Sequence, residues 1–140
     1  MAFHRILLPV DFSDFTDVAL EKTSKLLAGD EKREVHFLFV LHTPTDFSTW
    51  SDDADAEMQE RLEQLIRDFQ PRLPAETKAT VCKGHPSTEI CRYAASQECD
   101  LIVMATHGRT GLKHMLLGST AEQVVRHAPC AVLTLRVRPD

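Results

Sequence analysis

The amino-acid sequence predicts an α/β protein with an open, doubly wound, five-stranded parallel sheet, strand order 3-2-1-4-5, and helices on both faces. Residues 35–41 and 101–105 are apolar runs without alternation, which is typical of strands buried on both faces of a parallel sheet. Segments with helical spacing of apolar residues lie between the apolar runs. Strand and helix therefore alternate along the chain, and right-handed crossovers place the helices on both sides of the sheet.

The first half of the chain contains two predicted strands and two predicted helices. Residues 5–10 form a strand that stops at the Pro9-Val10-Asp11 corner, and residues 35–41 form the next. Ser13 is placed to cap the helix between them, and Gly29 to end it. Its expected apolar side comprises Phe15, Val18, Ala19 and Leu26. Residues 43–55 indicate a long loop. The helix that follows ends at Pro71 and has as its apolar side Met58, Leu62, Leu65, Ile66 and Phe69.

The second half repeats the pattern. Residues 78–83 alternate and suit a short edge strand, and Gly84-His85-Pro86 forms a turn. The next helix is expected to bury Ile90, Cys91, Ala94 and Ala95. After the strand at 101–105 and a glycine-containing loop, a last helix is expected to bury Ala121, Val124, Val125 and Ala128. Residues 130–137 close the chain as an edge strand.

Composition limits the classes of protein to be considered. The chain has 140 residues, 43% of them hydrophobic and 26% charged, which predicts one globular domain over residues 1–140. No apolar run approaches the roughly 20 residues of a membrane span, and no secretory signal begins the chain, so we expect a cytoplasmic protein. The net charge of −5 disfavours nucleic acid and anionic membrane surfaces as partners.

The cysteines and histidines do not form a metal-binding pattern. Cys82, Cys91, Cys99 and Cys130 lack CxxC spacing, so we expect buried, reduced thiols. None of the seven histidines is paired at the helical spacing that zinc motifs use. His36 and His42 share the parity of one strand but are too far apart to bind one ion directly. We therefore expect no resident metal site.

The stretch from Asp100 to Thr120 combines a buried strand, a glycine loop and a helix start. The loop contains Gly108, Gly111 and Gly118, and Ser119 begins the helix. A helix N-terminus offers backbone N–H groups without internal partners, and glycines allow close approach, so this arrangement favours an anion such as phosphate. With the order 3-2-1-4-5, the strand order reverses between the first and fourth strands, where Asp11 would face the glycine loop.

These residues resemble those of the universal stress protein family, whose superfamily also holds the adenine-binding domain of electron-transfer flavoproteins (adenine nucleotide alpha hydrolase-like). The likeness covers the whole chain: ILLPVDFS at the start, Gly84-His85-Pro86, and THGRTGLKHMLLGSTAEQVVRHAPCAVLTLR. The nucleotide-binding branch carries a glycine, two residues, a glycine, nine residues, and a glycine followed by Ser or Thr. The second and third glycines correspond to Gly108 and Gly118. The first is replaced by Ala105, whose methyl is tolerated where φ is negative.

The resemblance implies a site for ATP with Mg²⁺. Asp11 would hold the ribose or adenine end beside the backbone of Pro9 and Val10, and Val40 would line the adenine pocket. Ala105 would lie near the ribose and phosphate. The residues that would hold the phosphates are Gly108, Arg109, Gly118, Ser119 and Thr120. An alternative stays open for Ser119, because Ser119 and Glu122 also have the spacing of a helix capping box.

Other nucleotide and phosphate proteins of this architecture fit less well. A receiver domain needs an acidic cluster around Asp11, a flavodoxin needs glycines after the first strand, and a P-loop enzyme needs its lysine. The sequence therefore indicates an ATP-binding stress-response protein without fast turnover, and a homodimer through the edge strand at 130–137. The rival hypothesis is a dimeric interaction module of the same fold that binds no nucleotide.

Overall fold

The computed structural model of the protein describes residues 3–12, 14–27, 33–42, 52–69, 75–107 and 118–137. Within them, strands and helices alternate in the predicted order, and the predicted fold class is confirmed. The elements are β1 (Arg5–Val10), α1 (Asp14–Leu27), β2 (Arg33–His42), α2 (Asp52–Phe69), β3 (Ala75–Gly84), α3 (Pro86–Ser96), β4 (Leu101–His107), α4 (Ser119–His127) and β5 (Ala131–Val137).

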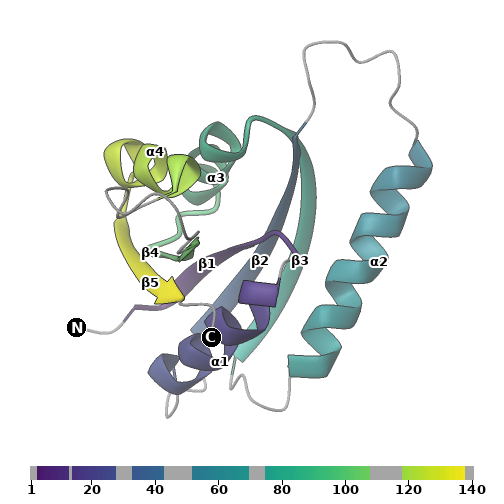
Figure 1. Ribbon diagram of the computed structural model, residues 1–140, viewed down its shortest axis with the longest axis horizontal. Coiled ribbons are helices and arrows are strands. Elements are labelled where there is room, and N and C mark those ends of the chain that lie inside the picture. The colour runs from purple at the N-terminus through teal and green to yellow at the C-terminus, as the bar shows by residue number, and fades with distance from the viewer. Residues whose placement is uncertain are drawn as a thin grey trace.

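The five strands form one parallel sheet in the order β3-β2-β1-β4-β5. The helices α3 and α4 lie together on one side of it, and α1 and α2 lie on the other (Figure 1). β3 and β5 are the edge strands, as the sequence predicts. The carboxyl ends of all five strands therefore meet at one edge of the sheet, which we call the carboxyl edge.

Each face of the sheet carries its own hydrophobic core. Alternate residues of β1 point to opposite faces, so Ile6 and Leu8 pack on the side of α1 and α2, whereas Leu7 packs on the side of α3 and α4. The last strand alternates in the same way, because Leu133 and Leu135 pack on one side and Val132 on the other. The sheet is thus covered on both faces, which agrees with the apolar runs in its central strands.

The predicted burial of several apolar helix residues is wrong. Val18 and Leu26 of α1 are 40% and 54% exposed, and Val125 of α4 is 48% exposed. Ala95 of α3 is also exposed. In α1 the small polar residues Thr23 and Ser24 are buried instead, and each donates its hydroxyl to a backbone carbonyl within the helix, at 2.7 Å. Hydroxyls that are hydrogen-bonded in this way can be buried at low cost in free energy. The pattern of polar and apolar residues therefore does not identify the buried face of α1.

Element boundaries differ from the prediction mainly at α2. Asp52 to Asp55, assigned to a loop, form the first turn of α2. Acidic residues are favoured in the first turn of a helix by the positive end of its dipole, which explains how a polar run begins a helix. β3 is longer than the short strand predicted at 78–83. Ser13, Gly29, Pro71 and the loop at 43–51 lie outside the described residues.

Candidate functional site at the carboxyl edge

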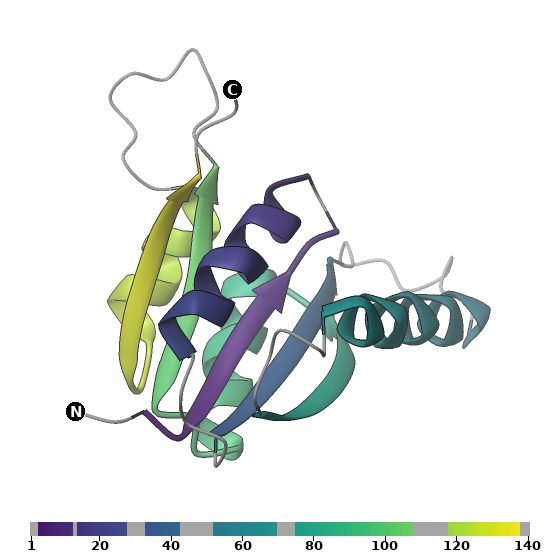
Figure 2. The ribbon, with the colours of Figure 1, turned by 90° about the horizontal axis from the view of Figure 1, so that it is seen from below.

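β1 and β4, the strands at the reversal of strand order, separate toward the carboxyl edge. They pair only at their beginnings, where Ile6 lies opposite Leu101 and Leu7 opposite Ile102. Beyond those pairs β1 continues along β2 to Val10, and β4 continues along β5 to His107. Figure 2 shows the two strands diverging toward their arrowheads. The sheet thus opens at the topological switch point, where ligands of such folds bind.

The position of Pro9 explains where β1 and β4 stop pairing. The carbonyl of His4 accepts from Glu34 of β2, and the carbonyl of Arg5 accepts from the residue before β4, Asp100. Backbone groups alternate along a strand, so those of Pro9, like those of Arg5, face β4. Proline has no N–H to donate, and the ladder between β1 and β4 loses a donor at this position.

Asp11 follows β1 directly and lies at the carboxyl edge. Its side chain is exposed, and its Oδ1 accepts a hydrogen bond of 3.1 Å from the Thr16 hydroxyl of α1. Val10 before it is buried in the core on the side of α1 and α2. Val40 is half-buried on the other face, against the core below α3 and α4. The structure thus places Pro9, Val10, Asp11 and Val40 at the carboxyl ends of neighbouring strands.

Gly118 is the N-cap of α4, and Ser119 and Thr120 form its first turn. Glu122 makes the first intrahelical bond, donating its N–H to the Gly118 carbonyl at 2.9 Å. The N–H groups of Ser119, Thr120 and Ala121 therefore have no partner within the helix, and they point from its positive end. The Ser119 hydroxyl is exposed. This turn has the groups that an anion requires.

The capping-box alternative for Ser119 is wrong. The N-cap is Gly118, which has no side chain to cap with, and Ser119 is already the first helical residue. The Glu122 carboxylate instead accepts from the Arg126 guanidinium at 2.9 Å, one helical turn later. The Ser119 hydroxyl is thus not engaged in helix capping.

Ala105, which replaces the first glycine of the motif, lies within β4 opposite Leu135. Among the residues that the structure describes, the positive φ values of non-glycine residues are those of Phe12 and Glu98, so Ala105 needs no glycine conformation. Its parity with Leu101 and Val103 directs the methyl toward the face of α1 and α2, opposite to α4. Gly108 and Arg109 lie outside the described residues.

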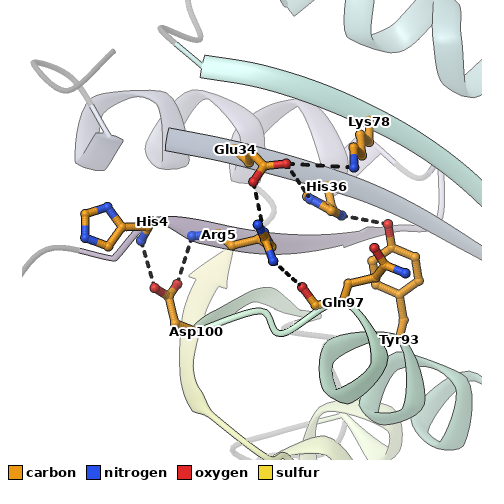
Figure 3. Close-up of polar contacts among 8 residues, drawn as sticks. All are labelled: His4, Arg5, Glu34, His36, Lys78, Tyr93, Gln97 and Asp100. Atoms are coloured by element: carbon orange, nitrogen blue, oxygen red, sulfur yellow. Dashed lines mark hydrogen bonds and ion pairs between the residues drawn. The ribbon is translucent and has the colours of Figure 1, made fainter. Parts of the chain in front are cut away.

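The opposite edge of the sheet contains a polar cluster that resembles a site. We call Arg5, Glu34, His36, Lys78, Tyr93 and Asp100 the amino-edge network (Figure 3). His36 is 1% exposed, and its Nδ1 lies 2.7 Å from the Tyr93 hydroxyl. Arg5 donates to Glu34 at 2.9 Å, and the Asp100 carboxylate accepts the backbone N–H of Arg5 at 3.0 Å. These contacts hold strand ends together, which is a structural role.

Burial and ion pairing set the protonation of that network. Burial lowers the pKa of His36 below its ordinary value of 6.5, although Glu34 opposes this change. The hydrogen bond from Arg5 lowers the pKa of Glu34. His36 Nε2 lies 3.5 Å from Glu34 Oε1 and has no hydrogen-bond partner. His36 is therefore neutral near pH 7. In the sequence, its shared parity with His42 is the feature that stands out, and this feature gives no indication of the amino-edge network.

The cysteines form no site. All four are free, Cys99 is buried and the other three are partly buried. Burial raises the pKa of Cys82 and of Cys99 to about 11, so neither is a reactive thiolate at neutral pH. In the described parts of the chain no group of three or more His, Cys, Asp or Glu side chains could hold a metal ion. No described helix is long and apolar enough to cross a membrane.

Comparisons with known proteins agree with this fold. The model of the universal stress protein family matches residues 2–136. A universal stress protein of Methanothermobacter thermautotrophicus is 32% identical over 96% of this chain and 96% of its own length. The solved structure of the hypothetical protein MJ0577 superposes with a TM-score of 0.81 and 26% identity, covering all of both chains.

Two more distant structures share the fold and were solved with adenine nucleotides. A universal stress protein from Archaeoglobus fulgidus in complex with dAMP has a TM-score of 0.67 at 20% identity, covering 96% of this chain and 98% of its own. The structure of a universal stress protein in complex with cAMP has a TM-score of 0.75 at 17% identity, covering 97% of this chain and 98% of its own. From its sequence match and its fold, the chain belongs to the universal stress protein family.

Proposed function

We propose that this protein binds ATP, together with Mg²⁺, at the carboxyl edge and acts in the cytoplasm as a regulatory or sensor protein of the stress response. The observation that carries the proposal is Gly118. Its φ of −67° suits any residue, and a β-carbon there would meet no atom of the described residues within 4 Å. The described fold thus has no need of glycine at this position. A glycine is needed where another group approaches the backbone closely, and phosphate is such a group.

The surroundings of Gly118 support a nucleotide over a simple anion. Asp11 supplies an exposed carboxylate suited to ribose hydroxyls, and Val40 supplies an apolar surface suited to a purine ring. β1 and β4 no longer pair beyond Leu7, so the sheet is open beside Asp11. Complexes of dAMP and cAMP with proteins of the same fold are consistent with adenine as the base. We assign the ribose end to Asp11 and the phosphate end to Gly118, Ser119 and Thr120, with Gly108 and Arg109 as further phosphate ligands.

The same residues favour holding ATP over hydrolysing it. Fast hydrolysis needs a group that orients or deprotonates water in line with the terminal phosphate. Among the described residues of the first turn of α4, Glu122 is the acid, and it is paired with Arg126. With no three-residue metal cluster in the described chain, Mg²⁺ would be held chiefly by the phosphates and water. Binding that is equal in ground and transition states gives no acceleration.

A thermal-shift experiment with Mg-ATP tests this function. At 100 times the dissociation constant, ligand stabilises the folded state by about 2.7 kcal/mol, which raises the melting temperature by roughly 5 to 10 °C for a domain of this size. Asp11→Ala should reduce the shift, whereas Asp68→Ala, at an exposed acid of α2 remote from the carboxyl edge of β1, should not. Wild-type protein with no shift at millimolar Mg-ATP contradicts the proposal.

The competing function is a dimeric interaction module that binds no nucleotide, and Ala105 in place of the motif glycine is the observation that favours it. Both functions share a second proposal, a homodimer through the free edge of β5. The Arg136 carbonyl accepts from Lys22 at 3.3 Å, so the even-numbered residues of β5 turn their backbone groups away from β4. These groups can pair with a second copy of the strand.

The direction of the β5 backbone allows a specific test of the dimer. Thr134→Pro removes an N–H that faces away from β4, so the β4–β5 ladder keeps its hydrogen bonds while pairing with a second copy is blocked. We expect light scattering to report a dimer for the wild type and a monomer for Thr134→Pro. A monomeric wild type at micromolar concentration contradicts the assembly.

A further inference from the structure

Phe12, which follows Asp11, has an unusual backbone conformation. Its φ is 60°, in the left-handed region that residues with a β-carbon rarely adopt. The chain turns here between the end of β1 at Val10 and the start of α1 at Asp14. Strained backbone persists only where its surroundings hold it, and it concentrates at binding sites. The conformation of Phe12 therefore requires contacts that hold it.

Two neighbouring elements hold the aromatic ring of Phe12. Its centroid lies 4.9 Å from that of Phe39 on β2, with the rings tilted by 42°. The Arg61 guanidinium of α2 lies 4.4 Å from the same centroid, over the ring face. The ring is thus covered on one side by an aromatic side chain and on another by a cation, and both contacts are favourable. Phe12 is only partly buried, and its ring packs against the margin of the core on the side of α1 and α2.

From these contacts we propose that Phe12 is a positioning residue that fixes the Asp11 carboxylate for its ligand, and that Arg61 and Phe39 secure it. The proposal rests on the nucleotide-binding function assigned above. The left-handed turn at Phe12 sets the direction in which Asp11 leaves the strand, while the hydrogen bond from Thr16 orients the carboxylate. Because Arg61 belongs to α2, the same contact links that helix to the nucleotide site.

A purely structural role predicts a different outcome. If Phe12 serves only packing, its substitution changes the stability of the folded protein, but folded molecules keep their affinity for nucleotide. If it positions Asp11, its substitution weakens binding only while Asp11 is present. A double-mutant cycle between Phe12 and Asp11, measured on nucleotide affinity, separates the two roles.

The experiment is calorimetric titration of Mg-ATP into folded wild type, Phe12→Ala, Asp11→Ala and the double variant. We expect Asp11→Ala to weaken affinity about tenfold or more, as for a hydrogen bond to a charged group, and Phe12→Ala about fivefold. The double variant should match Asp11→Ala, because nothing then remains to be positioned. Phe12→Tyr keeps the ring and should restore affinity. If Phe12→Ala does not fold, Phe12→Leu takes its place.

A matched pair on α2 tests the role of Arg61. Arg61→Ala should weaken affinity about two- to threefold by releasing the Phe12 ring. Arg67→Ala removes another exposed arginine of the same helix, which contacts Gln64, and should leave affinity unchanged. Additive effects of Phe12→Ala and Asp11→Ala, or no effect of Phe12→Ala in a protein that binds ATP, overturn the inference alone. A wild type that does not bind ATP overturns the proposed function and the inference with it.

Discussion

The two edges of the sheet both gather polar residues, but they do so in opposite ways. In the amino-edge network the polar side chains bond to neighbouring groups of the protein. The Asp100 carboxylate, for example, accepts hydrogen bonds from the backbone N–H groups of His4 and Arg5. At the carboxyl edge Asp11 and Ser119 are exposed, and the backbone N–H groups that begin α4 point outward. A cluster that satisfies itself stabilises the fold, whereas exposed polar groups at the end of a strand or the start of a helix are accessible to a ligand.

Removing His36 should give the largest effect and should be confined to stability. His36→Ala opens a cavity in the core and leaves the Tyr93 hydroxyl without its 2.7 Å partner. We expect the free energy of unfolding to fall by about 3 kcal/mol, measured with urea. Nucleotide affinity should not change, since His36 lies opposite Leu7, four residues or about 13 Å along β1 from Asp11. Lys78→Ala, at a side chain 58% exposed, is the control and should cost less than about 0.5 kcal/mol.

Acidification should weaken the amino edge of the sheet. The pKa of His36 is lowered in the folded state by burial, so the unfolded chain takes up the proton more readily. The stability that neutral His36 provides is present above about pH 6.5 and is lost as pH falls below it. The groups that face the imidazole are Tyr93 of α3, Glu34 of β2, Lys78 of β3 and Arg5 of β1.

Urea unfolding of wild type and His36→Leu at about pH 7.5 and pH 5.5 checks the sign of this effect. The wild type should lose more stability on acidification than the variant, which cannot titrate at this position. Glu34, whose pKa is lowered by the hydrogen bond from Arg5, adds its own loss only at pH values below its ordinary pKa of 4.5. Equal losses in the two proteins would show that His36 does not control the response.

Gly118→Ala should have the reverse profile of His36→Ala. The β-carbon meets no atom of the residues that the structure describes within 4 Å and φ is −67°, so the free energy of unfolding should change by less than about 1 kcal/mol. Affinity for Mg-ATP should fall about tenfold, because the methyl occupies the path of the phosphate to the backbone. Calorimetric titration measures this change. Unaltered affinity would remove the main support for a phosphate site at α4.

Ala105→Gly should give the smallest effect. The methyl of Ala105 points to the face of α1 and α2, so its removal should change nucleotide affinity by less than about twofold. Glycine within β4 should lower the free energy of unfolding by about 0.5 to 1 kcal/mol. A clear gain in affinity, measured by the same titration, would instead mean that the methyl crowds the ribose and weakens nucleotide binding in this chain.

The fold was largely predictable because its signals are local and repeated. Continuous apolar runs identified the central strands, and the handedness of crossovers limited the strand order to few choices. Which helical residues are buried was less predictable. Val18 and Val125 are exposed while Thr23 is buried, because the face a helix presents to the sheet depends on how the helix docks. Spacing alone does not contain that angle.

The sequence by itself determined the order of elements, the placement of Asp11 at the end of β1, and the absence of glycine at position 105. Only the tertiary structure decided that β1 and β4 part after Leu7, that Gly118 rather than Ser119 caps α4, and that the methyl of Ala105 turns away from that helix. It also joined His36 to Tyr93 and Phe12 to Arg61, pairs that lie 57 and 49 residues apart in sequence. Contacts between distant residues depend on how elements pack, and local sequence patterns do not encode them.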